Sequence, residues 1–385
     1  MSATGIKFDI TKDDLSSFSK DGAAFVTFGE TMIRDMPNDF QRLEMTRNVL
    51  ISLAGSELTL AMVLARFGVP SAYITRVPNN PYGWLIRDTA RSQGINTDHF
   101  VWASKAEPVG RLLYELGRTP RKSVAYYQRM YSAASKLGAG MVDWKSALKH
   151  CKLFHTSGIT FGLAYHSKYE KNYLLEAFYE AVAAKPSDCL VGMDFNYRAT
   201  LWSPDQCRDV TTGLIRDHVD ILITTIEDMA QLFNISCGQY SAEQIEKGDI
   251  GDLTDNDIKA FAAQVGEKFN TKIVAITIRY PDSFEQHRWE TAAMDSQGNF
   301  FRSPAVKPIV LMDRLGGGDT WNGGFYYGLL TAGFNAAGIE KGVLVGDAAT
   351  RIKQTMMFDL PIVTKGEVQD LLKADIEGGG KRVSR

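Results

Sequence analysis

Three consecutive glycines interrupt the chain between two apolar segments of different periodicity. The short apolar run before them, residues 308–312, predicts the end of a strand, and the residues after them repeat apolar side chains at the helical spacing of Trp321, Phe325 and Leu329. Glycine has no Cβ, so the backbone N–H groups of such a turn can point into one concavity. The start of the following helix adds free N–H donors and about half a positive charge. The sequence therefore predicts an anion site at a strand-to-helix turn, and phosphate is the usual anion.

A carboxylate follows these glycines directly. We expect Asp319 in the first turn of the helix, where it could accept a proton from a substrate hydroxyl while the amides hold the charge of a phosphoryl group. The alternative is a glycine turn capped by an aspartate. A second aspartate six residues upstream, Asp313, and the pair Gly323-Gly324 inside the helix, where each glycine costs about 0.5–1 kcal/mol, count against that alternative. We therefore predict Asp319 as a general base, with an anion hole made by Gly316, Gly317 and Gly318.

Two other phosphate-binding loops do not fit this chain. No glycine loop is followed by Gly-Lys-Ser or Gly-Lys-Thr, and Trp321 occupies the third glycine position of a Gly-x-Gly-x-x-Gly pattern.

The stretch from Asp313 to Phe325 resembles the C-terminal signature of the PfkB, or ribokinase-like, family of sugar kinases. In that family an Asp-x-x-Gly-x-Gly-Asp run supplies the anion hole and the base, and the resemblance extends from about Val26 to Leu371. It implies a ribokinase-like α/β fold, a three-layer αβα sandwich with a mainly parallel central sheet and a small β-sheet lid. It also implies an enzyme that uses ATP and Mg²⁺, with the metal on ATP oxygens and water and not in a dedicated set of protein ligands.

Composition excludes several other classes of protein. The net charge of −2 provides no basic field for nucleic acid or for an acidic membrane surface. The four cysteines form no Cys-x-x-Cys pair, and reduced thiols in a cytoplasmic protein are the default for such a chain. No apolar run approaches membrane length, and the first residues lack the features of a signal peptide. We therefore expect a cytoplasmic enzyme that acts on a small-molecule substrate.

Strand-like segments alternate with helical segments along most of the chain, which predicts a parallel sheet covered on both faces. We assign residues 23–375 to one kinase domain. The polar residues 1–22 are expected to form an extension outside the core, and the Gly- and Lys/Arg-rich residues 376–385 a disordered tail.

A small second sheet is predicted from residues 31–36 and from two alternating, paired strands within 109–129. The resemblance implies that this sheet is a lid over the sugar. It also implies that the lid joins two copies of the chain, so we expect a homodimer.

The resemblance assigns two candidate substrate residues to a helix that starts near residue 55. Leu64-Ala65-Arg66-Phe67-Gly68 fits the end of the family's first motif, whereas Ala54 and Thr59 replace its first glycine and its asparagine. A glycine before a helix lets a ligand approach the backbone, and Glu57 matches a variant found in 2-keto-3-deoxygluconate kinases. Gly55 and Glu57 are therefore expected to bind substrate, and the alternative is an ordinary helix start.

Tyr127 and Arg129 stand two residues apart and should share one face of a strand. A planar guanidinium group beside a phenol suits a carboxylate. The alternative is a solvated arginine at the edge of the lid. Tyr127 to Ala133 resembles the Tyr-x-Arg-x-x-Ser-Ala run of 2-keto-3-deoxygluconate kinases, which implies that both side chains bind an acid sugar.

A strand that ends in Asp194-Phe195-Asn196 places polar groups at the carboxyl edge of the sheet, where open α/β folds bind ligands. The alternative is helix capping. The resemblance makes Asn196 a nucleotide contact and Arg198 a contact of the nucleotide or of the substrate carboxylate.

Three further site residues come from the resemblance alone. It places Thr225 and Thr277 at the nucleotide, although Thr225 and Asp228 replace the family's Asn-x-x-Glu and so weaken any direct metal contact there. Asp359 lies where the keto-deoxygluconate kinase branch has Gly-Asp-Phe-Asn and is expected to bind substrate.

Together these features predict a kinase of 2-keto-3-deoxygluconate that phosphorylates the terminal hydroxyl. A kinase of fructose or of another ketose is the alternative within the family. A non-catalytic relative that binds a sugar or a nucleotide is the alternative of another class.

Overall fold

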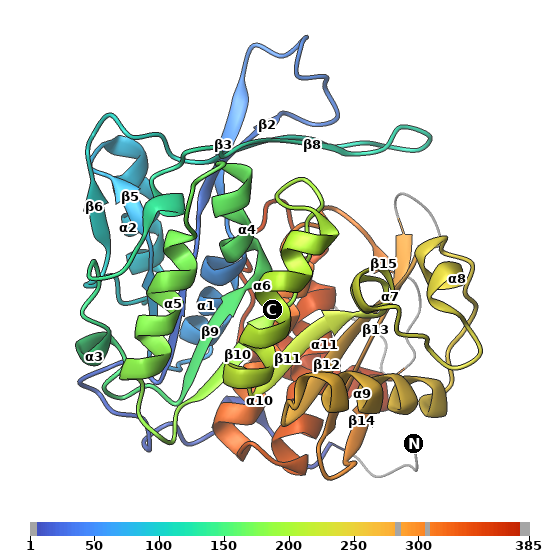
Figure 1. Ribbon diagram of the computed structural model, residues 1–385. Coiled ribbons are helices and arrows are strands. Elements are labelled where there is room, and N and C mark those ends of the chain that lie inside the picture. Colours follow the sequence, from blue (N-terminus) through green and yellow to red (C-terminus); the bar gives the residue numbers. More distant parts are fainter. Residues whose placement is uncertain (1–5, 282–285, 305–308, 378–385) are drawn as a thin grey trace.

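The central feature is a large sheet whose strands are mostly parallel (Figure 1). A computed structural model describes residues 6–281, 286–304 and 309–377. The strand order is β14-β13-β12-β11-β10-β9-β1-β4, with β15 paired to β13. Within this order, the neighbouring strands β12, β11, β10, β9, β1 and β4 are all parallel, and β13 pairs with its neighbours in antiparallel fashion. The strands are β1 (Phe25–Phe28), β4 (Ser71–Ile74), β9 (Leu153–Ser157), β10 (Leu190–Asp194), β11 (Ile221–Thr225), β12 (Ile273–Pro281), β13 (Gln286–Asp295), β14 (Phe300–Arg302) and β15 (Ile309–Val310).

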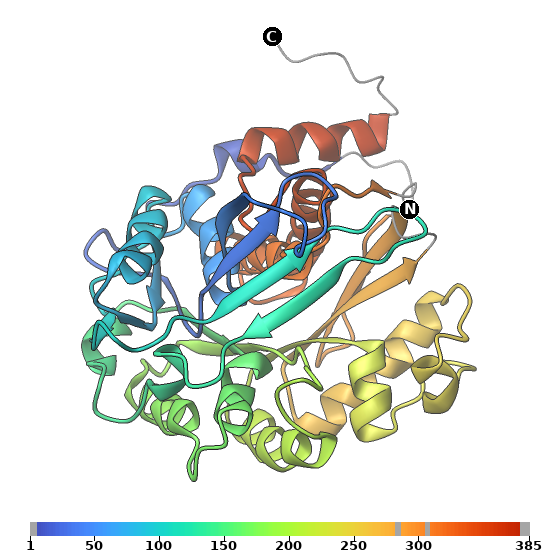
Figure 2. The same ribbon diagram turned by 90° about the horizontal axis from the view of Figure 1, so that it is seen from above.

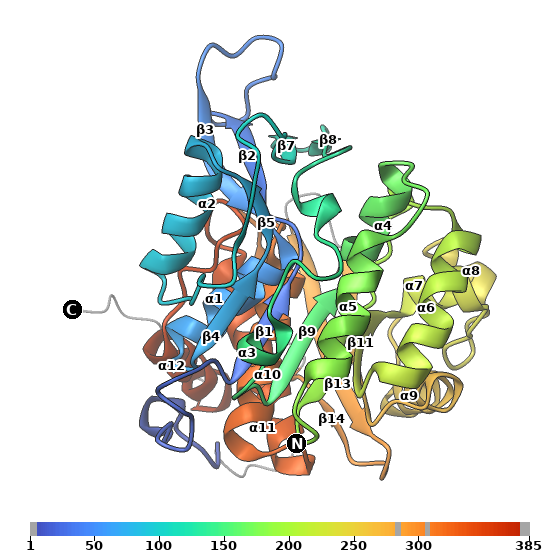
Figure 3. The ribbon, with the colours of Figure 1, turned by 60° about the vertical axis from the view of Figure 1, so that its left-hand side comes forward.

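Helices cover both faces of this sheet, as Figure 3 shows. One face carries α1 (Ser56–Arg66), α10 (Gly317–Ala332), α11 (Ala336–Lys353) and α12 (Lys365–Glu377). The other carries α3 (Trp144–Ala147), α4 (Gly158–His166), α5 (Tyr173–Ala184), α6 (Pro204–His218), α7 (Ile226–Phe233), α8 (Ala242–Glu246) and α9 (Asp255–Phe269). Each face has its own hydrophobic core, one around Phe154 and Phe178 and one around Trp321 and Phe325. The predicted three-layer sandwich is confirmed.

Glycines inside α10 permit unusually close helix packing. A Cβ on Gly323 would lie 2.6 Å from Cβ of Val63 in α1, and one on Gly324 would lie 2.5 Å from the backbone of Gly346 in α11. Core packing therefore accounts for these two glycines, and they are not evidence for a phosphate site.

The predicted lid is a four-stranded sheet in the order β3-β2-β7-β8. It consists of β2 (Met32–Pro37), β3 (Val49–Ala54), β7 (Arg111–Glu115) and β8 (Val124–Gln128), and in Figure 2 it lies across the molecule when seen from above. The strands expected at 31–36 and within 109–129 are confirmed. The sequence did not predict β3, because its apolar residues Val49, Leu50 and Ile51 are exposed and do not alternate.

Beside the main sheet, α2 (Pro81–Ser92) packs near a separate parallel pair, β5 (Arg76–Pro78) and β6 (Val101–Ala103). Within the part of the chain that the structure describes, no helix combines the length and the apolar character that crossing a bilayer requires.

The N-terminal residues 6–22 do not lie outside the core, so that part of the prediction is wrong. Ile10, in a short 3₁₀ turn (Ile10–Lys12), is fully buried, and its N–H donates to Oε1 of Gln369 at 2.9 Å. Asp13 accepts hydrogen bonds from Nζ of Lys341 (2.7 Å) and from the hydroxyl of Tyr327 (2.6 Å). Polar residues in this segment bind polar groups of the helical layer, which is why composition alone misplaces it. Residues 376 and 377 of the predicted disordered tail belong to α12, so the prediction is wrong there, and the tail from residue 378 onward lies outside the described residues.

Candidate active site

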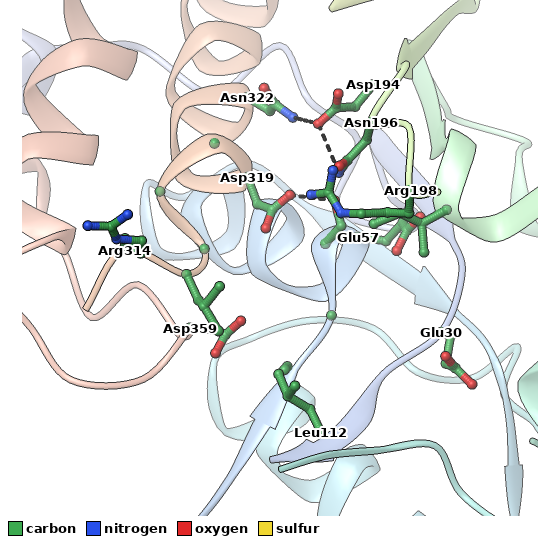
Figure 4. A pocket seen from close by; sticks show the side chains of 18 of the residues that line it. Glu30, Glu57, Leu112, Asp194, Asn196, Arg198, Arg314, Asp319, Asn322 and Asp359 are labelled. Carbon is green, nitrogen blue, oxygen red and sulfur yellow. Dashed lines mark hydrogen bonds between the residues drawn. The ribbon is translucent and has the colours of Figure 1, made fainter. Parts of the chain in front are cut away.

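A cavity of about 350 Å³ lies between the lid, the carboxyl ends of the central strands and the start of α10. Figure 4 shows part of its lining. All of the predicted site residues line it: Gly55, Glu57, Tyr127, Arg129, Asn196, Arg198, Thr225, Thr277, Gly316, Gly317, Gly318, Asp319 and Asp359. Residues up to about 300 positions apart in the sequence thus share one cavity. Their individual roles remain predictions.

The three glycines at the start of α10 differ in what requires them. Gly316 has φ +74° and a Cβ on it would lie 2.4 Å from the carbonyl oxygen of Asp359, so this position needs glycine for both reasons. A Cβ on Gly317 would lie 2.7 Å from Nε2 of Gln354. At Gly318 a Cβ would meet nothing closer than Nη2 of Arg279, at 4.0 Å, so it would project into open space at the cavity.

Asp319 lies in the first turn of α10, as predicted. Its Oδ1 accepts a 2.5 Å hydrogen bond from Oγ of Ser56, the first residue of α1. Burial raises the pKa of Asp319, while the Ser56 hydroxyl and the positive charges of Arg198, Lys353 and Arg279 act in the opposite direction. A carboxylate with a raised pKa inside a cavity is suited to accept a proton.

A second carboxylate, Asp194, lies at the end of β10; the sequence placed it at the ligand-binding edge of the sheet but gave it no role. Its Oδ2 accepts from Nδ2 of Asn322 at 2.9 Å, and both residues line the cavity (Figure 4). Burial, with the nearby negative charge of Asp319, raises the pKa of Asp194 to about 7. Asn322 follows Asp319 by three residues, a spacing that puts both side chains on one helix face. This spacing could have identified Asn322 as a residue of the cavity.

Two arginines, Arg198 and Arg279, line the cavity together with Asp319. Arg198 donates to the backbone carbonyl oxygen of Tyr197 at 2.8 Å, an acceptor without formal charge. Arg279 is exposed, and its guanidinium carbon lies 5.3 Å from the centre of the Trp289 ring. Burial raises the pKa of Asp228, on the same sheet edge, to about 6. The strand-end pattern predicted Arg198, but nothing in the sequence separated Arg279 from an ordinary strand residue.

Arg129 is buried at the lid, so the alternative of a solvated arginine is wrong. Its Nη2 lies 2.5 Å from Oε2 of Glu30, and Nε donates to the same oxygen at 2.6 Å. Ser132 also donates to Glu30. The guanidinium group lies 5.9 Å from the centre of the Tyr127 ring, so the predicted pair is adjacent, although Arg129 follows the end of β8. Glu30 was not predicted, because its partner lies far away in the sequence.

Glu57 and Gly55 meet the cavity from the start of α1. Glu57 accepts hydrogen bonds from Ser157 (2.6 Å) and Thr160 (2.8 Å), and burial raises its pKa. A Cβ on Gly55 would lie 2.8 Å from the backbone oxygen of Glu30. Both residues line the cavity, and their part in substrate binding stays a prediction.

Asp359 binds a buried arginine of the lid. Arg34, in β2, lies 2.5 Å from Oδ1 of Asp359 and 2.5 Å from Oδ2 of Asp313, which in turn accepts from the N–H of Phe358 at 3.1 Å. Burial raises the pKa of Asp359 to about 6, against the attraction of Arg34. Asp313, the first aspartate of the signature, thus connects the lid to the glycine turn.

Thr225 and Thr277 come from neighbouring parallel strands and are paired in register. Oγ1 of Thr225 caps α7 by accepting from the N–H of Asp228 at 3.1 Å. Over the described ranges, no group of three or more His, Cys, Asp or Glu side chains is arranged to hold a metal ion.

Comparison with known proteins identifies the family of this chain. The family model described as pfkB family carbohydrate kinase matches residues 24–356. A 2-dehydro-3-deoxygalactonokinase of Haloferax volcanii is 27% identical over 361 residues, which cover 92% of this chain and 98% of that protein. A 2-dehydro-3-deoxygluconokinase of Bacillus subtilis is 25% identical over 325 residues, covering 83% of this chain and 87% of that protein.

A solved structure gives the same result for the fold. The 2-dehydro-3-deoxygluconokinase of Thermotoga maritima superposes with a TM-score of 0.80 at 28% identity, and the match covers 91% of this chain and 99% of that one. The predicted ribokinase-like fold is confirmed. Because the family model spans most of the chain and the cavity is built from the family's signature, the protein belongs to the pfkB family of carbohydrate kinases and is an ATP-dependent kinase of a small-molecule sugar.

Proposed function

We propose that the protein transfers the γ-phosphate of ATP to the terminal hydroxyl of 2-keto-3-deoxygluconate, also called 2-dehydro-3-deoxygluconate. One observation carries the proposal: the carboxylate of Asp319 lies in the first turn of α10, beside the glycine turn and inside the cavity under the lid. A hydroxyl bound there would be within reach of a base and of an anion site at the same time.

In this proposal Asp319 accepts the proton of the attacking hydroxyl. The N–H groups at the start of α10 hold the charge that builds on the transferred phosphoryl group, and Arg279 adds positive charge from the sheet edge. The hydrogen bond from Ser56 keeps Asp319 in one orientation.

The glycine turn fits a nucleotide phosphate. A Cβ on Gly318 would fill open space at the cavity beside Arg279, and this cradle is where we place the phosphate. Asn196, Thr225 and Thr277 line the adjacent sheet edge, where we place the rest of the nucleotide. Mg²⁺ would stay on phosphate oxygens and water, and its waters would meet the carboxylates Asp194 and Asp228.

Recognition of an acid sugar needs a cation near the lid, because a buried unpaired carboxylate is costly. Arg198 supplies one. Arg129 directs part of its guanidinium group to Glu30, and its remaining N–H donors, out of five, can meet a substrate carboxylate beside Tyr127. Glu57 and Asp359 would hold sugar hydroxyls.

The C4 epimer, 2-keto-3-deoxygalactonate, is a second candidate substrate, favoured by the name of the Haloferax relative. It carries the same carboxylate and the same terminal hydroxyl. A neutral ketose such as fructose needs no cation at the lid.

A coupled ADP-release assay over these two acids, fructose and ribose tests the proposal, with NMR used to locate the phosphate on the product. We expect the highest kcat/KM with one of the two acids and phosphorylation of the terminal hydroxyl. Faster turnover of fructose than of either acid would contradict the assignment.

We also propose a homodimer through the lid and a cytoplasmic location. The edge strand β3 exposes Val49, Leu50 and Ile51, which supports contact with a second copy. The four cysteines are free and buried, which fits a reducing compartment.

A further inference from the structure

We infer that Lys353 is a positioning residue for phosphoryl transfer, whose buried ammonium group holds the loop leading into the glycine turn and places a positive charge behind it. This inference deepens the proposed function, since it rests on the glycine turn being the phosphate site.

The contacts of Lys353 are with the loop itself. Lys353 is the last residue of α11 and is fully buried. Its Nζ donates to the backbone oxygen of Asp313 at 3.2 Å and to that of Leu315. These two carbonyls belong to residues one and three positions before Gly316, the N-cap of α10. The ammonium group therefore fixes the direction in which the chain enters the turn.

Two neighbours of Lys353 hold the same loop. The backbone oxygen of Gln354 accepts from the N–H of Met312 at 2.8 Å, and Oγ1 of Thr350 donates to the oxygen of Gly317 at 3.0 Å. The end of α11 thus contacts the loop on both sides of Gly316. Of the three residues that make these contacts, Lys353 brings a formal charge.

Among the described residues Lys353 forms no direct salt bridge, and its ammonium group donates to backbone carbonyls instead. The two carboxylates that attract it most, Asp313 and Asp359, each lie 2.5 Å from Arg34. Burial lowers the pKa of Lys353, against the attraction of these two carboxylates. Methionine would fill a similar volume without the desolvation cost of an ammonium group. A buried positive charge next to an anion site can stabilise the negative charge that builds there during the reaction.

The field of Lys353 also reaches the base. Burial raises the pKa of Asp319, and the positive charge of Lys353 opposes that rise. Arg198 and Arg279 also oppose it, and the carboxyl groups of Glu57 and Asp194 interact with Asp319 electrostatically. Removing the ammonium group should therefore weaken the anion site and raise the pKa of Asp319 together. A residue that only packs the core would do neither.

The test compares Lys353→Met with Lys341→Met. Lys341 lies on the same helix, is also buried, and pairs with Asp13 far from the cavity. We expect Lys353→Met to lower kcat by about 10–100-fold, less than the loss of a direct oxyanion donor, and to move the acid limb of the kcat–pH profile upward. Lys341→Met should lower Tm and leave kcat per folded molecule within about twofold of the wild type.

A second variant covers the case in which Lys353→Met does not fold. Lys353→Gln keeps an N–H donor for the loop carbonyls and removes the charge. If kcat and the acid limb of either folded Lys353 variant match the wild type, the inference is overturned. Asp319→Asn, measured in the same series, separates the two ideas: loss of activity there with full activity in Lys353→Gln rejects only the role of Lys353, whereas full activity in Asp319→Asn rejects the proposed site.

Discussion

The hydroxyl of Ser56 lies 2.5 Å from Oδ1 of Asp319 and joins the first turn of α1 to the first turn of α10. Residues 263 positions apart thus orient the proposed base. Asp319→Asn keeps the shape of this contact and removes the base. We expect kcat to fall by about 10²–10⁴-fold while ATP affinity, measured by calorimetry, changes little. A variant that keeps more than about a tenth of wild-type kcat would show that Asp319 is not the base.

Ser56→Ala probes the pH dependence of the same pair. The base must be deprotonated, so kcat falls as pH decreases through the pKa of Asp319. The Ser56 hydroxyl lowers that pKa, so its loss should move the acid limb of the kcat–pH profile to higher pH. Measuring the profile for both proteins checks this, and an acid limb that does not move would mean that another group controls it.

Gly318 and Gly316 offer a matched pair of substitutions. Gly318→Ala adds a methyl group to the cavity without a close protein contact, so we expect a higher KM for ATP and a lower kcat at unchanged Tm. Gly316→Ala must adopt φ +74° and meets the oxygen of Asp359, so we expect a loss of stability of at least about 1 kcal/mol. Unchanged kinetics in Gly318→Ala would remove this glycine from the phosphate site.

Arg198 is expected to distinguish acid from neutral substrates. Charge-assisted hydrogen bonds contribute roughly 1.5–3 kcal/mol, so Arg198→Ala should lower kcat/KM for the acid sugar about 10–100-fold more than for fructose. Arg129→Ala should also lower kcat/KM for the acid sugar more than for fructose. It should in addition lower Tm, because Glu30 would lose its buried partner. The double variant Arg129→Ala/Glu30→Gln is the control for that second effect. Equal losses for the two substrates would favour a ketose kinase.

Asp194 should make stability depend on pH. Its folded-state pKa of about 7 lies above the ordinary value of 3.8, so its stabilising effect is complete below the ordinary value and is lost as pH rises through about 7. Asp194→Asn should therefore raise the free energy of unfolding near pH 8 by up to about 4 kcal/mol and change it little near pH 4. Chemical denaturation at both pH values checks this. Equal effects at the two values would mean that Asp194 does not titrate in this range.

Ile51→Asp tests the proposed dimer. Ile51 is about half exposed on the edge strand β3, and a carboxylate there should break an apolar interface between two lids. Sedimentation velocity should show a dimer for the wild type and a monomer for the variant. Tyr179→Asp, at an exposed apolar position on α5, is the control and should remain dimeric. A monomeric wild type would contradict the proposal.

The sequence by itself determined the sandwich and the place of the glycine turn at the start of a helix. Alternating strands and helices predict a covered parallel sheet from local periodicity, and the order of strand, three glycines and Asp319 predicts an anion site from backbone geometry alone. Asn196, Arg198, Thr225 and Thr277 came together because parallel strands end at the same edge. The two lid strands within 109–129 were predictable because their alternation is local.

Only the tertiary structure decided which partners the polar residues find. Glu30 meets Arg129, Arg34 meets both Asp313 and Asp359, and Lys353 meets the loop before Gly316, all across long separations in the sequence. The docking of residues 6–22 through Ile10 and Asp13 depends on the same kind of contact. A buried charge is stabilised by whatever the fold places against it, and no local pattern records that partner. Periodicity therefore predicts the layers of this protein, while the pairing of its buried charges follows from the packing of those layers.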